Sequence, residues 1–325
     1  MKILPCPSNE LCYCCVVFEA YQLGPFLLRS HLLFLLLGIW LASELFLRLA
    51  IAEGLPVAHF LRRAPFYLLA FLIGGRMFAV LLLYRAYLQD PLRIFAISDG
   101  GFTFIGGCIG VGILLFLSTL RERNTTFLQW LDALAPAVTL GEFLDWLGRF
   151  FGNLSYGKPT DVPFGITVES MAVRYTVPIH PVQLYYAAYF LGLTYILLRI
   201  RKRESNRAGF VTLVFILASA FAVLLFESFR GDFAITVFAK LSDFFFLAAL
   251  FASLGMVAIL EQRLSPRYSV MNSIGMGLGT AAYILLRPWI AVASVEWRFS
   301  QFLTVLAVLG TVVYVVVHRW KYPHL

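Results

Sequence analysis

Charged residues are scarce in this sequence. Only 14% of its 325 residues are Asp, Glu, Lys or Arg, while 60% are hydrophobic, and the mean hydropathy is +0.82. A soluble domain carries about 25% charged and about 45–50% apolar residues. The chain therefore has too few polar side chains to cover a water-soluble surface, which argues against a soluble enzyme, a nucleic-acid-binding domain and a disordered protein. The composition predicts an all-α, polytopic integral membrane protein.

Cysteine is also rare, and most of it crowds one end of the chain. Cys6, Cys12, Cys14 and Cys15 lie close together, with no His nearby to complete a zinc site. We therefore favour incidental or disulfide-paired thiols and expect neither a metal ion nor a cofactor. The first ten residues lack a basic stretch followed by an apolar run, so no cleavable signal peptide is expected.

Apolar runs dominate the rest of the chain. A spanning helix needs about 20 mostly apolar residues, and nine segments approach that description. The predicted spans are residues 26–49, 65–88, 101–120, 127–152, 181–200, 208–229, 240–260, 270–294 and 300–318. The longest connection between them, residues 153–180, is rich in turn-forming residues. Such non-helical segments often carry function, although a plain connector would look the same.

Basic residues divide unevenly between the two sets of helix ends. The richer set comprises positions 62–63, 121–123, 199–207, 263–267 and 319–321, and the poorer set contains Arg85, Arg93, Lys158, Arg174, Arg230 and Arg298. Cytoplasmic loops carry the excess of Lys and Arg. The sequence therefore predicts an external N-terminus, an external 153–180 loop and an internal C-terminus.

Ionisable residues inside spans are costly, which makes them candidates for function. They are Glu44, Arg76, Glu142, Asp145, Arg149, Glu227, Asp243 and Arg287. The densest group is Glu142, Asp145 and Arg149, whose spacing places them on one helix face. Two interpretations stay open: a polar cavity that holds a lipid headgroup, or a self-neutralising cluster that fixes helix packing.

Three further motifs are candidates for function or packing. Arg76 follows two glycines in mid-span, and its fork suits either a lipid phosphate or a carboxylate such as Glu142 or Glu227. His180 opens the fifth span and is either a general base or a hydrogen-bonded interfacial residue. Gly106 and Gly110 form a small-xxx-small pair that allows close helix approach.

The order of several motifs resembles the prolipoprotein diacylglyceryl transferase family. The motifs are Leu-Gly-Pro at 23–25, Gly-Gly-Arg at 74–76, SDGGFTFIGG at 98–107, Ala-Pro at 135–136, YGKPTDVPFG at 156–165, HPVQLY at 180–185 and FESFR at 226–230. Together they cover most of residues 23–262. YGKPTDVPFG and HPVQLY are the most specific.

The resemblance implies both an architecture and a reaction. It implies a bacterial inner-membrane protein with seven spans in residues 26–262, preceded by an extracytoplasmic segment, 1–25. Residues 263–325 then form an additional transmembrane pair. The implied reaction moves the diacylglyceryl group of phosphatidylglycerol to the lipobox cysteine thiol of a secreted preprotein. The implied partners are that phospholipid, that peptide and the membrane, with no nucleic acid.

Several positions depart from the family pattern. They are Ile105 in place of a His, Trp146, Val223 and Ile179 in place of Arg, Arg149 in place of an Asn, and Leu154 in place of a Glu. A three-residue shift aligns Arg149 with the family Arg and recovers Asn153. Two hypotheses follow: a transferase with a rearranged site and an altered substrate, or a catalytically degenerate paralogue that binds phospholipid or lipoprotein precursor.

The candidate site residues combine the motif matches with the in-span charges. The candidate catalytic residues are His180, His31 and Arg149. The candidate substrate-binding residues are Arg76, Glu142, Asp145, Asn153, Gly157, Gln183, Tyr185, Glu227 and Arg230.

Overall fold

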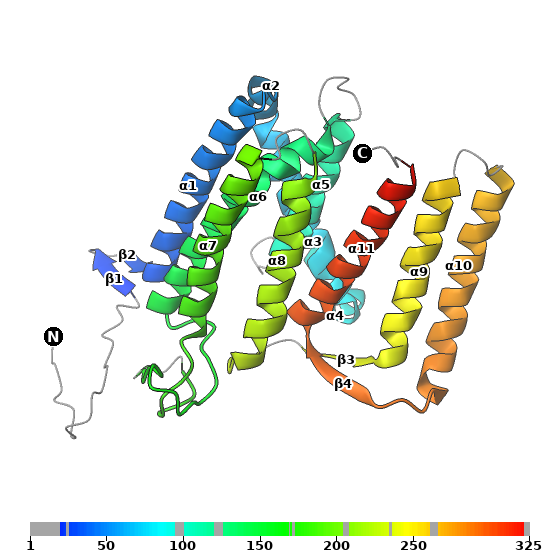
Figure 1. Cartoon of the computed structure of the whole chain (residues 1–325). Coiled ribbons are helices and arrows are strands. Elements are labelled where there is room, and N and C mark those ends of the chain that lie inside the picture. Colours follow the sequence, from blue (N-terminus) through cyan, green and yellow to red (C-terminus); the bar gives the residue numbers. More distant parts are fainter. Residues whose placement is uncertain are drawn as a thin grey trace. The chain divides into compact units, whose positions relative to one another are not determined.

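A computed structural model of the chain describes residues 20–23, 26–94, 101–119, 126–168, 170, 173–203, 208–233, 236–260 and 266–321. Nine long α-helices dominate these residues (Figure 1). They are α1 Ser30–Ala52, α3 Ala64–Leu82, α5 Phe104–Thr119, α6 Phe127–Phe151, α7 Val182–Arg203, α8 Phe210–Phe226, α9 Leu241–Leu260, α10 Pro266–Leu286 and α11 Phe299–Lys321. Each overlaps one predicted span, although residues 26–29 of the first predicted span form a strand, and the all-α class is confirmed.

Shorter elements join these helices. They are the helices α2 Val57–Arg62 and α4 Tyr84–Gln89, the 3₁₀ turns η1 Pro91–Ile94, η3 Glu227–Phe229 and η4 Arg287–Trp289, and the strands β1 Ala20–Leu23, β2 Phe26–Arg29, β3 Thr236–Lys240 and β4 Ser294–Arg298. β1 pairs with β2, and β3 pairs with β4, both antiparallel. Apolar runs do not predict the second pair, because its strands are separated in sequence by α9 and α10.

Two predicted spans are wrong at their C-terminal ends. The span predicted over 65–88 breaks at Leu83, whose φ of −109° and ψ of 30° separate α3 from α4. The span predicted over 270–294 ends at Leu286, just before the turn that contains Pro288. Proline has no amide hydrogen to donate to the carbonyl oxygen four residues earlier, so the α-helix gives way to the 3₁₀ turn η4, and the chain becomes extended at Ile290.

Several helices are suited to a lipid environment. By length and composition, four could cross a bilayer: Ser30–Ala52, Ala64–Leu82, Phe210–Phe229 and Phe299–Val317. Large apolar side chains such as Leu36, Leu81 and Phe245 are 54%, 67% and 69% exposed. Exposure of this kind is natural in lipid and a liability in water. Among the other long helices, α5 is shorter, and α6 is less apolar because it carries the acidic and basic side chains described below.

The described residues form two compact units. The larger takes the described residues within Met1–Ile39, Thr139–Tyr195 and Leu213–Leu325, and the smaller takes those within Trp40–Val138 and Ile196–Thr212. Helices α1, α6, α7 and α8 each contribute residues to both units.

An aromatic cluster forms the core of the smaller unit. The Phe60 ring stacks on Tyr67 and Trp130, with centroids 4.7 and 5.2 Å apart. Beside this cluster, Oδ1 of the buried Asp132 accepts hydrogen bonds from the amide and the hydroxyl of Thr212, at 2.8 and 2.6 Å. Asp132 therefore caps the first turn of α8, where free amide groups favour a negative charge.

Glycines bring α3 and α5 close together in the smaller unit. A Cβ atom on Gly74 would lie 3.0 Å from the Cα atom of Gly110. A Cβ atom on Gly106 would collide with the carbonyl oxygen of Gly74. The close approach predicted for the Gly106–Gly110 pair is confirmed, and larger side chains there would push the two backbones apart.

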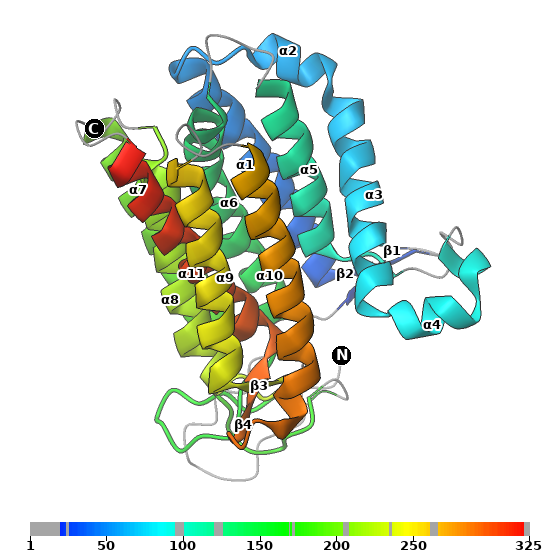
Figure 2. The ribbon, with the colours of Figure 1, turned by 90° about the vertical axis from the view of Figure 1, so that its right-hand side faces the viewer.

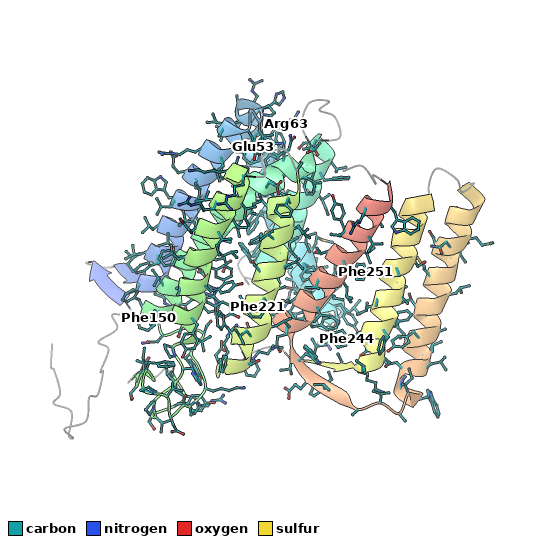
Figure 3. All side chains as sticks on the ribbon, viewed as in Figure 1. Glu53, Arg63, Phe150, Phe221, Phe244 and Phe251 are labelled. Atoms are coloured by element: carbon teal, nitrogen blue, oxygen red, sulfur yellow. The ribbon has the colours of Figure 1, made fainter. Side chains whose placement is uncertain are left out.

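In the larger unit, α9 packs against α10 and α11. Phe244 and Phe251 on α9, labelled in Figure 3, face α11, and the Phe244 ring lies 5.8 Å from Phe302. Asp243 and Arg287, both predicted to lie inside spans, pair at 2.8 Å across the ends of α9 and α10. The β3–β4 pair lies at that same end, as Figure 2 shows.

The 153–180 connection is tied by its backbone to the segment after α8. The amide of Lys158 donates to the carbonyl oxygen of Phe229 at 2.8 Å, and the amide of Gly231 donates to Tyr156 at 2.9 Å. The described residues of this connection are not helical, as predicted. Because Arg230 also contacts Arg298, the 153–180 connection, the end of α8 and the start of α11 lie at one end of the larger unit.

Candidate functional site

A histidine and an arginine share one aspartate where α1 meets α6. Nε2 of His31 lies 2.9 Å from Oδ1 of Asp145, and Nε of Arg149 donates to Oδ2 of the same carboxylate at 2.6 Å. Gly148 permits this contact, because a Cβ atom there would lie 3.3 Å from the Cα atom of His31. His31 retains 26% side-chain exposure, so the group is accessible. Asp145 and Arg149, which the sequence places on one helix face, therefore form an ion pair.

The backbone after α6 adopts an unusual conformation. Asn153 and Ser155 have φ of 50° and 56°, and they are the non-glycine residues with positive φ within the described ranges. Such backbone is strained for residues with a side chain and often marks a functional site. The side-chain amide of Gln183 donates to the carbonyl oxygen of Leu154 at 2.9 Å and holds the turn in place.

Two guanidinium groups converge on the Ser155 hydroxyl. Nη1 of Arg149 donates to Oγ of Ser155 at 3.2 Å, and Nη2 of Arg230 approaches the same oxygen at 3.5 Å. Both guanidinium groups also lie over the Trp146 ring, at 4.9 and 6.0 Å from its centroid. The two positive groups are thus aimed at one oxygen, which is the arrangement that binds a phosphate oxygen.

A buried tyrosine lies beneath these arginines. The Tyr186 ring stacks on Trp146 with centroids 4.0 Å apart and planes 10° from parallel. Tyr186 is 1% exposed, and its buried hydroxyl has no hydrogen-bond partner among the described residues. Leaving a buried hydroxyl without a partner costs folding free energy.

Arg230 belongs to a network of two arginines and two carboxylates. It donates from Nη1 to Glu227 at 2.6 Å, and from Nη2 and Nε to Asp232 at 2.6 and 3.0 Å. Nη1 of Arg298 lies 3.2 Å from Asp232 and 3.4 Å from Glu227. Burial lowers the pKa of Arg230, but hydrogen bonds and charge from Asp232 and Glu227 more than offset this and raise its pKa overall. The guanidinium therefore stays charged.

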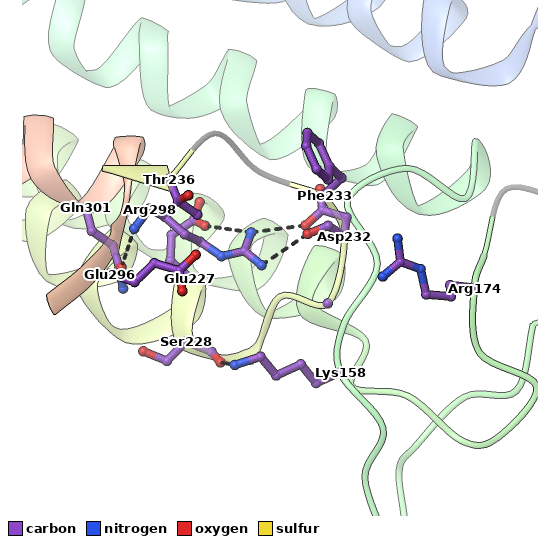
Figure 4. A pocket seen from close by; sticks show the side chains of 11 residues that line it. Lys158, Arg174, Glu227, Ser228, Asp232, Phe233, Thr236, Glu296, Arg298 and Gln301 are labelled. Atoms are coloured by element: carbon purple, nitrogen blue, oxygen red, sulfur yellow. Dashed lines mark hydrogen bonds and ion pairs between the residues drawn. The ribbon is translucent and has the colours of Figure 1, made fainter. Parts of the chain in front are cut away.

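A pocket of about 730 Å³ opens beside this network (Figure 4). Its lining includes Lys158, Arg174, Glu227, Asp232, Glu296 and Arg298. Cations and carboxylates thus line the same pocket, and Lys158 is tied to the carbonyl oxygen of Ser228 at 2.8 Å. This volume is in the range of small-molecule sites.

The other predicted residues of the larger unit build the framework of the loop. Nδ1 of His180 lies 3.2 Å from the Tyr185 hydroxyl, and the His180 ring packs on Phe229. A Cβ atom on Gly157 would collide with the carbonyl oxygen of His180, so this position needs glycine. Among the described contacts, none joins His180 to the His31–Asp145–Arg149 group. Glu142 is half-buried one turn before Asp145.

Arg76 lies in the smaller unit and is buried. It donates to the backbone carbonyl oxygens of Ile94, Gly101 and Arg93, the first two at 3.0 and 3.2 Å. These contacts join the middle of α3 to the segments around the α5 start. The Ser98–Asp99–Gly100 part of the SDGG motif lies outside the described residues, as does the N-terminal cysteine cluster.

Five residues of the site were not predicted from the sequence. They are Trp146, Ser155, Tyr186, Asp232 and Arg298. The in-span charge of Asp132 was also overlooked. Helical spacing alone would place the Trp146 side chain beside Arg149, because Trp146 lies one turn earlier on the same helix. Nothing local marks Arg298, whose partners lie more than 60 residues earlier in the chain.

The fold and the site together define a class of protein. Apolar helices, together with a His–Asp pair and two arginines aimed at one oxygen, define a multi-pass membrane protein with a charged site. A sequence model of the family named prolipoprotein diacylglyceryl transferase matches residues 19–261. The chain belongs to the prolipoprotein diacylglyceryl transferase family. It is therefore a multi-pass protein of the bacterial inner membrane.

Individual relatives agree with the family match. Each is named phosphatidylglycerol–prolipoprotein diacylglyceryl transferase. The protein from Geobacter sulfurreducens is 33% identical, over 65% of this chain and 80% of its own length. The protein from Parasynechococcus marenigrum is 29% identical, over 65% of this chain and 79% of its own length. A protein from Streptococcus pneumoniae is 29% identical, over 75% of this chain and 93% of its own length. The family match ends before α10, so η4, β4 and α11 also lie beyond it.

Proposed function

We propose that this protein transfers the diacylglyceryl group of phosphatidylglycerol to the lipobox cysteine thiol of a prolipoprotein. Family membership supports the reaction class, and the relatives' names supply both substrates. The observation that carries the proposal is the convergence of Arg149 and Arg230 on one oxygen beside the His31–Asp145 pair. The reaction needs cations on a departing phosphate and a base for the thiol, and this arrangement offers both.

Arg149 and Arg230 bind the lipid phosphate. A phosphate oxygen takes the position that Oγ of Ser155 occupies between the two guanidinium groups. Guanidinium groups already held in place stabilise the charge that develops on the departing phosphate. Trp146 supports both of them from one side through its ring face.

His31 accepts the thiol proton. Asp145 binds Nε2, which fixes the ring and stabilises the imidazolium that forms, while Nδ1 takes the proton. The sulfur then bonds to the glyceryl carbon, the bond between that carbon and the phosphate oxygen breaks, and glycerol phosphate leaves with the electron pair. His180, the other candidate base, instead positions the 153–180 loop through Tyr185 and Gly157.

The peptide reaches the site from the extracytoplasmic side. Lys158, Arg174, Arg230 and Arg298 all belong to the loops with fewer basic residues, which the positive-inside rule places outside. The N-terminus is then outside and the C-terminus inside. Residues 26–262 form the transferase domain, and residues 263–325 form a transmembrane pair attached to it.

The direct test uses purified protein in phosphatidylglycerol vesicles with a synthetic lipobox peptide. We expect a mass gain of one diacylglyceryl group on the peptide and release of glycerol phosphate. Arg149→Gln should lower the rate by about 10²–10³-fold, as removal of one preorganised donor does. Arg48→Gln, at an exposed arginine of α1 that pairs with Glu44, is the matched control and should leave the rate unchanged.

The degenerate paralogue is the alternative outcome of the same test. The replaced family positions, Ile105 and Val223 among them, motivate it. Phosphatidylglycerol binding without any peptide modification, while a relative is active under the same conditions, would favour the paralogue.

A further inference from the structure

We propose that Arg298, which lies beyond the part of the chain matched by the family, is a positioning residue of the phosphate site. It acts by neutralising Glu227 and Asp232, so that the Arg230 guanidinium remains available to an anionic headgroup. This inference rests on the proposed function and assigns a role in it to the C-terminal helices. The segment before α11 then completes the site.

The contacts of Arg298 are directed at this cluster. Its Nη1 lies 3.2 Å from Oδ1 of Asp232 and 3.4 Å from Oε2 of Glu227. Its Nη2 donates to the carbonyl oxygens of Arg230 at 2.7 Å and Asp232 at 3.2 Å. One side chain from the C-terminal segment thus binds four oxygens of the 227–232 segment. Both Arg298 and Asp232 are only 16% exposed, so solvent screens these contacts weakly.

Charge balance explains why this contact matters to an anionic ligand. Glu227 and Asp232 carry two negative charges, and Arg230 alone would neutralise one of them. With Arg298 present the four side chains are neutral as a group. Without it, a net negative charge would remain beside the position proposed for the phosphate, which would repel the headgroup and draw Arg230 toward the carboxylates.

The local fold is built to hold Arg298 in this position. Arg298 ends β4, where it is the register partner of Thr236 on β3. Its amide donates to Oε1 of Gln301 at 3.2 Å, at the start of α11. Figure 4 shows its side chain reaching from β4 across the pocket to Asp232. Backbone pairing and a capped helix start therefore limit the positions open to this side chain.

The experiment compares four variants of the full chain in phosphatidylglycerol vesicles. Arg298→Gln removes the charge. Arg298→Lys keeps the positive charge but removes the planar guanidinium group and its paired N–H donors. Arg298→Gln combined with Asp232→Asn removes one positive and one negative charge, so the remaining pair of Glu227 and Arg230 is neutral. Arg287→Gln is the matched control, because Arg287 is also beyond the family match and pairs with an aspartate, Asp243. The readouts are kcat, KM for phosphatidylglycerol, and the Tm shift caused by that lipid in detergent.

We expect Arg298→Gln to raise KM for phosphatidylglycerol at least about tenfold and to reduce the lipid-induced Tm shift. The double variant should recover most of this loss, and the Lys variant part of it. Arg287→Gln should lower Tm without changing KM. The proposal is overturned if Arg298→Gln changes KM no more than Arg287→Gln does, or if Asp232→Asn gives no recovery.

The same data separate this proposal from the proposed function. A wild-type protein that binds phosphatidylglycerol but modifies no peptide would contradict the transferase function. In that case the dependence of the lipid-induced Tm shift on Arg298, and its recovery in the double variant, still decide the role of Arg298. Transfer by wild type that is insensitive to Arg298 would overturn the present proposal alone.

Discussion

At the residue scale, one carboxylate organises the site. Asp145 contacts His31 from α1 and Arg149 from its own helix, with one oxygen for each. In the proposed mechanism, Asp145 is shared by the base and the phosphate-binding cation, and this fixes the distance between the two groups. Loss of Asp145 would therefore disturb both the orientation of the imidazole and the aim of the guanidinium.

We predict that His31 and Asp145 act as one unit. His31→Gln and Asp145→Asn should each lower the transfer rate by about 10²–10⁴-fold, the usual contribution of a positioned base. The double variant should lose little more than either single variant, because the partners act together. Rates with the lipobox peptide measure the coupling. Additive losses would show that the two side chains act independently and would remove His31 as the base.

The sequence predicts part of this site and not the rest, for physical reasons. Asp145 and Arg149 are four residues apart on one helix, so their pairing follows from helical geometry. His31 and Asp145 are 114 residues apart, and Arg298 lies 66 residues beyond Asp232. Such contacts depend on how helices pack, which residue spacing does not encode.

At the element scale, glycines set how closely segments approach. In the smaller unit, Gly106 faces Gly74 of α3, whereas Gly112, on the same helix α5, has open space around its Cα atom. In the larger unit, Gly157 lies against His180, whereas Gly192 on α7 is open. Substitutions at the close positions must therefore move backbone, and those at the open positions need not.

We predict opposite effects for alanine at paired glycines of α5. Gly106→Ala should destabilise the protein by about 1–3 kcal/mol, because the added methyl group overpacks the contact with α3. Gly112→Ala should be neutral or stabilise it by about 0.5–1 kcal/mol, through better helix propensity. Thermal unfolding in detergent compares the two. Equal Tm values would mean that α3 and α5 do not approach as closely as described.

A second glycine pair tests the loop. Gly157→Ala should displace the strand-like segment from His180 and lower both Tm and the transfer rate. Gly192→Ala should leave the rate unchanged, since an added Cβ atom there would meet no atom of the described residues within 4 Å. Unchanged activity of the Gly157→Ala protein would show that the position of the 153–180 loop does not affect catalysis.

The sequence predicts the long helices, but it does not predict the segments that connect them. Each run of about 20 apolar residues gives a helix because a bilayer leaves no other partner for the backbone. The β3–β4 pair and the end of α10 at Leu286 depend instead on tertiary pairing and on Pro288. Arg298 lies in the β3–β4 pair, beside the site. The part of the fold that is hardest to predict is therefore the part that we propose to act there.

At the scale of the whole molecule, the C-terminal helices extend a family domain. α9 packs on α10 and α11, and β4 returns the chain to the end where the 153–180 loop meets the end of α8. The charged loops at that end carry fewer basic residues than the opposite set. Together these features predict an extracytoplasmic site with both α9 and α11 starting beside it.

We predict that the C-terminus lies in the cytoplasm. A green fluorescent protein fused after residue 325 should fluoresce, and an alkaline phosphatase fused there should be inactive, because each folds on only one side of the inner membrane. An alkaline phosphatase inserted in the 153–180 loop should be active and serves as the matched comparison. Active phosphatase at the C-terminus would reverse the proposed orientation.

The most direct test of the central claim is complementation. The chain would be expressed in a bacterium depleted of its own diacylglyceryl transferase, and lipidation of a marker lipoprotein would be followed by gel shift. We expect rescue by the wild-type chain and loss of rescue with Arg149→Gln or His31→Gln. Absence of lipidation, with the protein folded in the membrane and still binding phosphatidylglycerol, would contradict it.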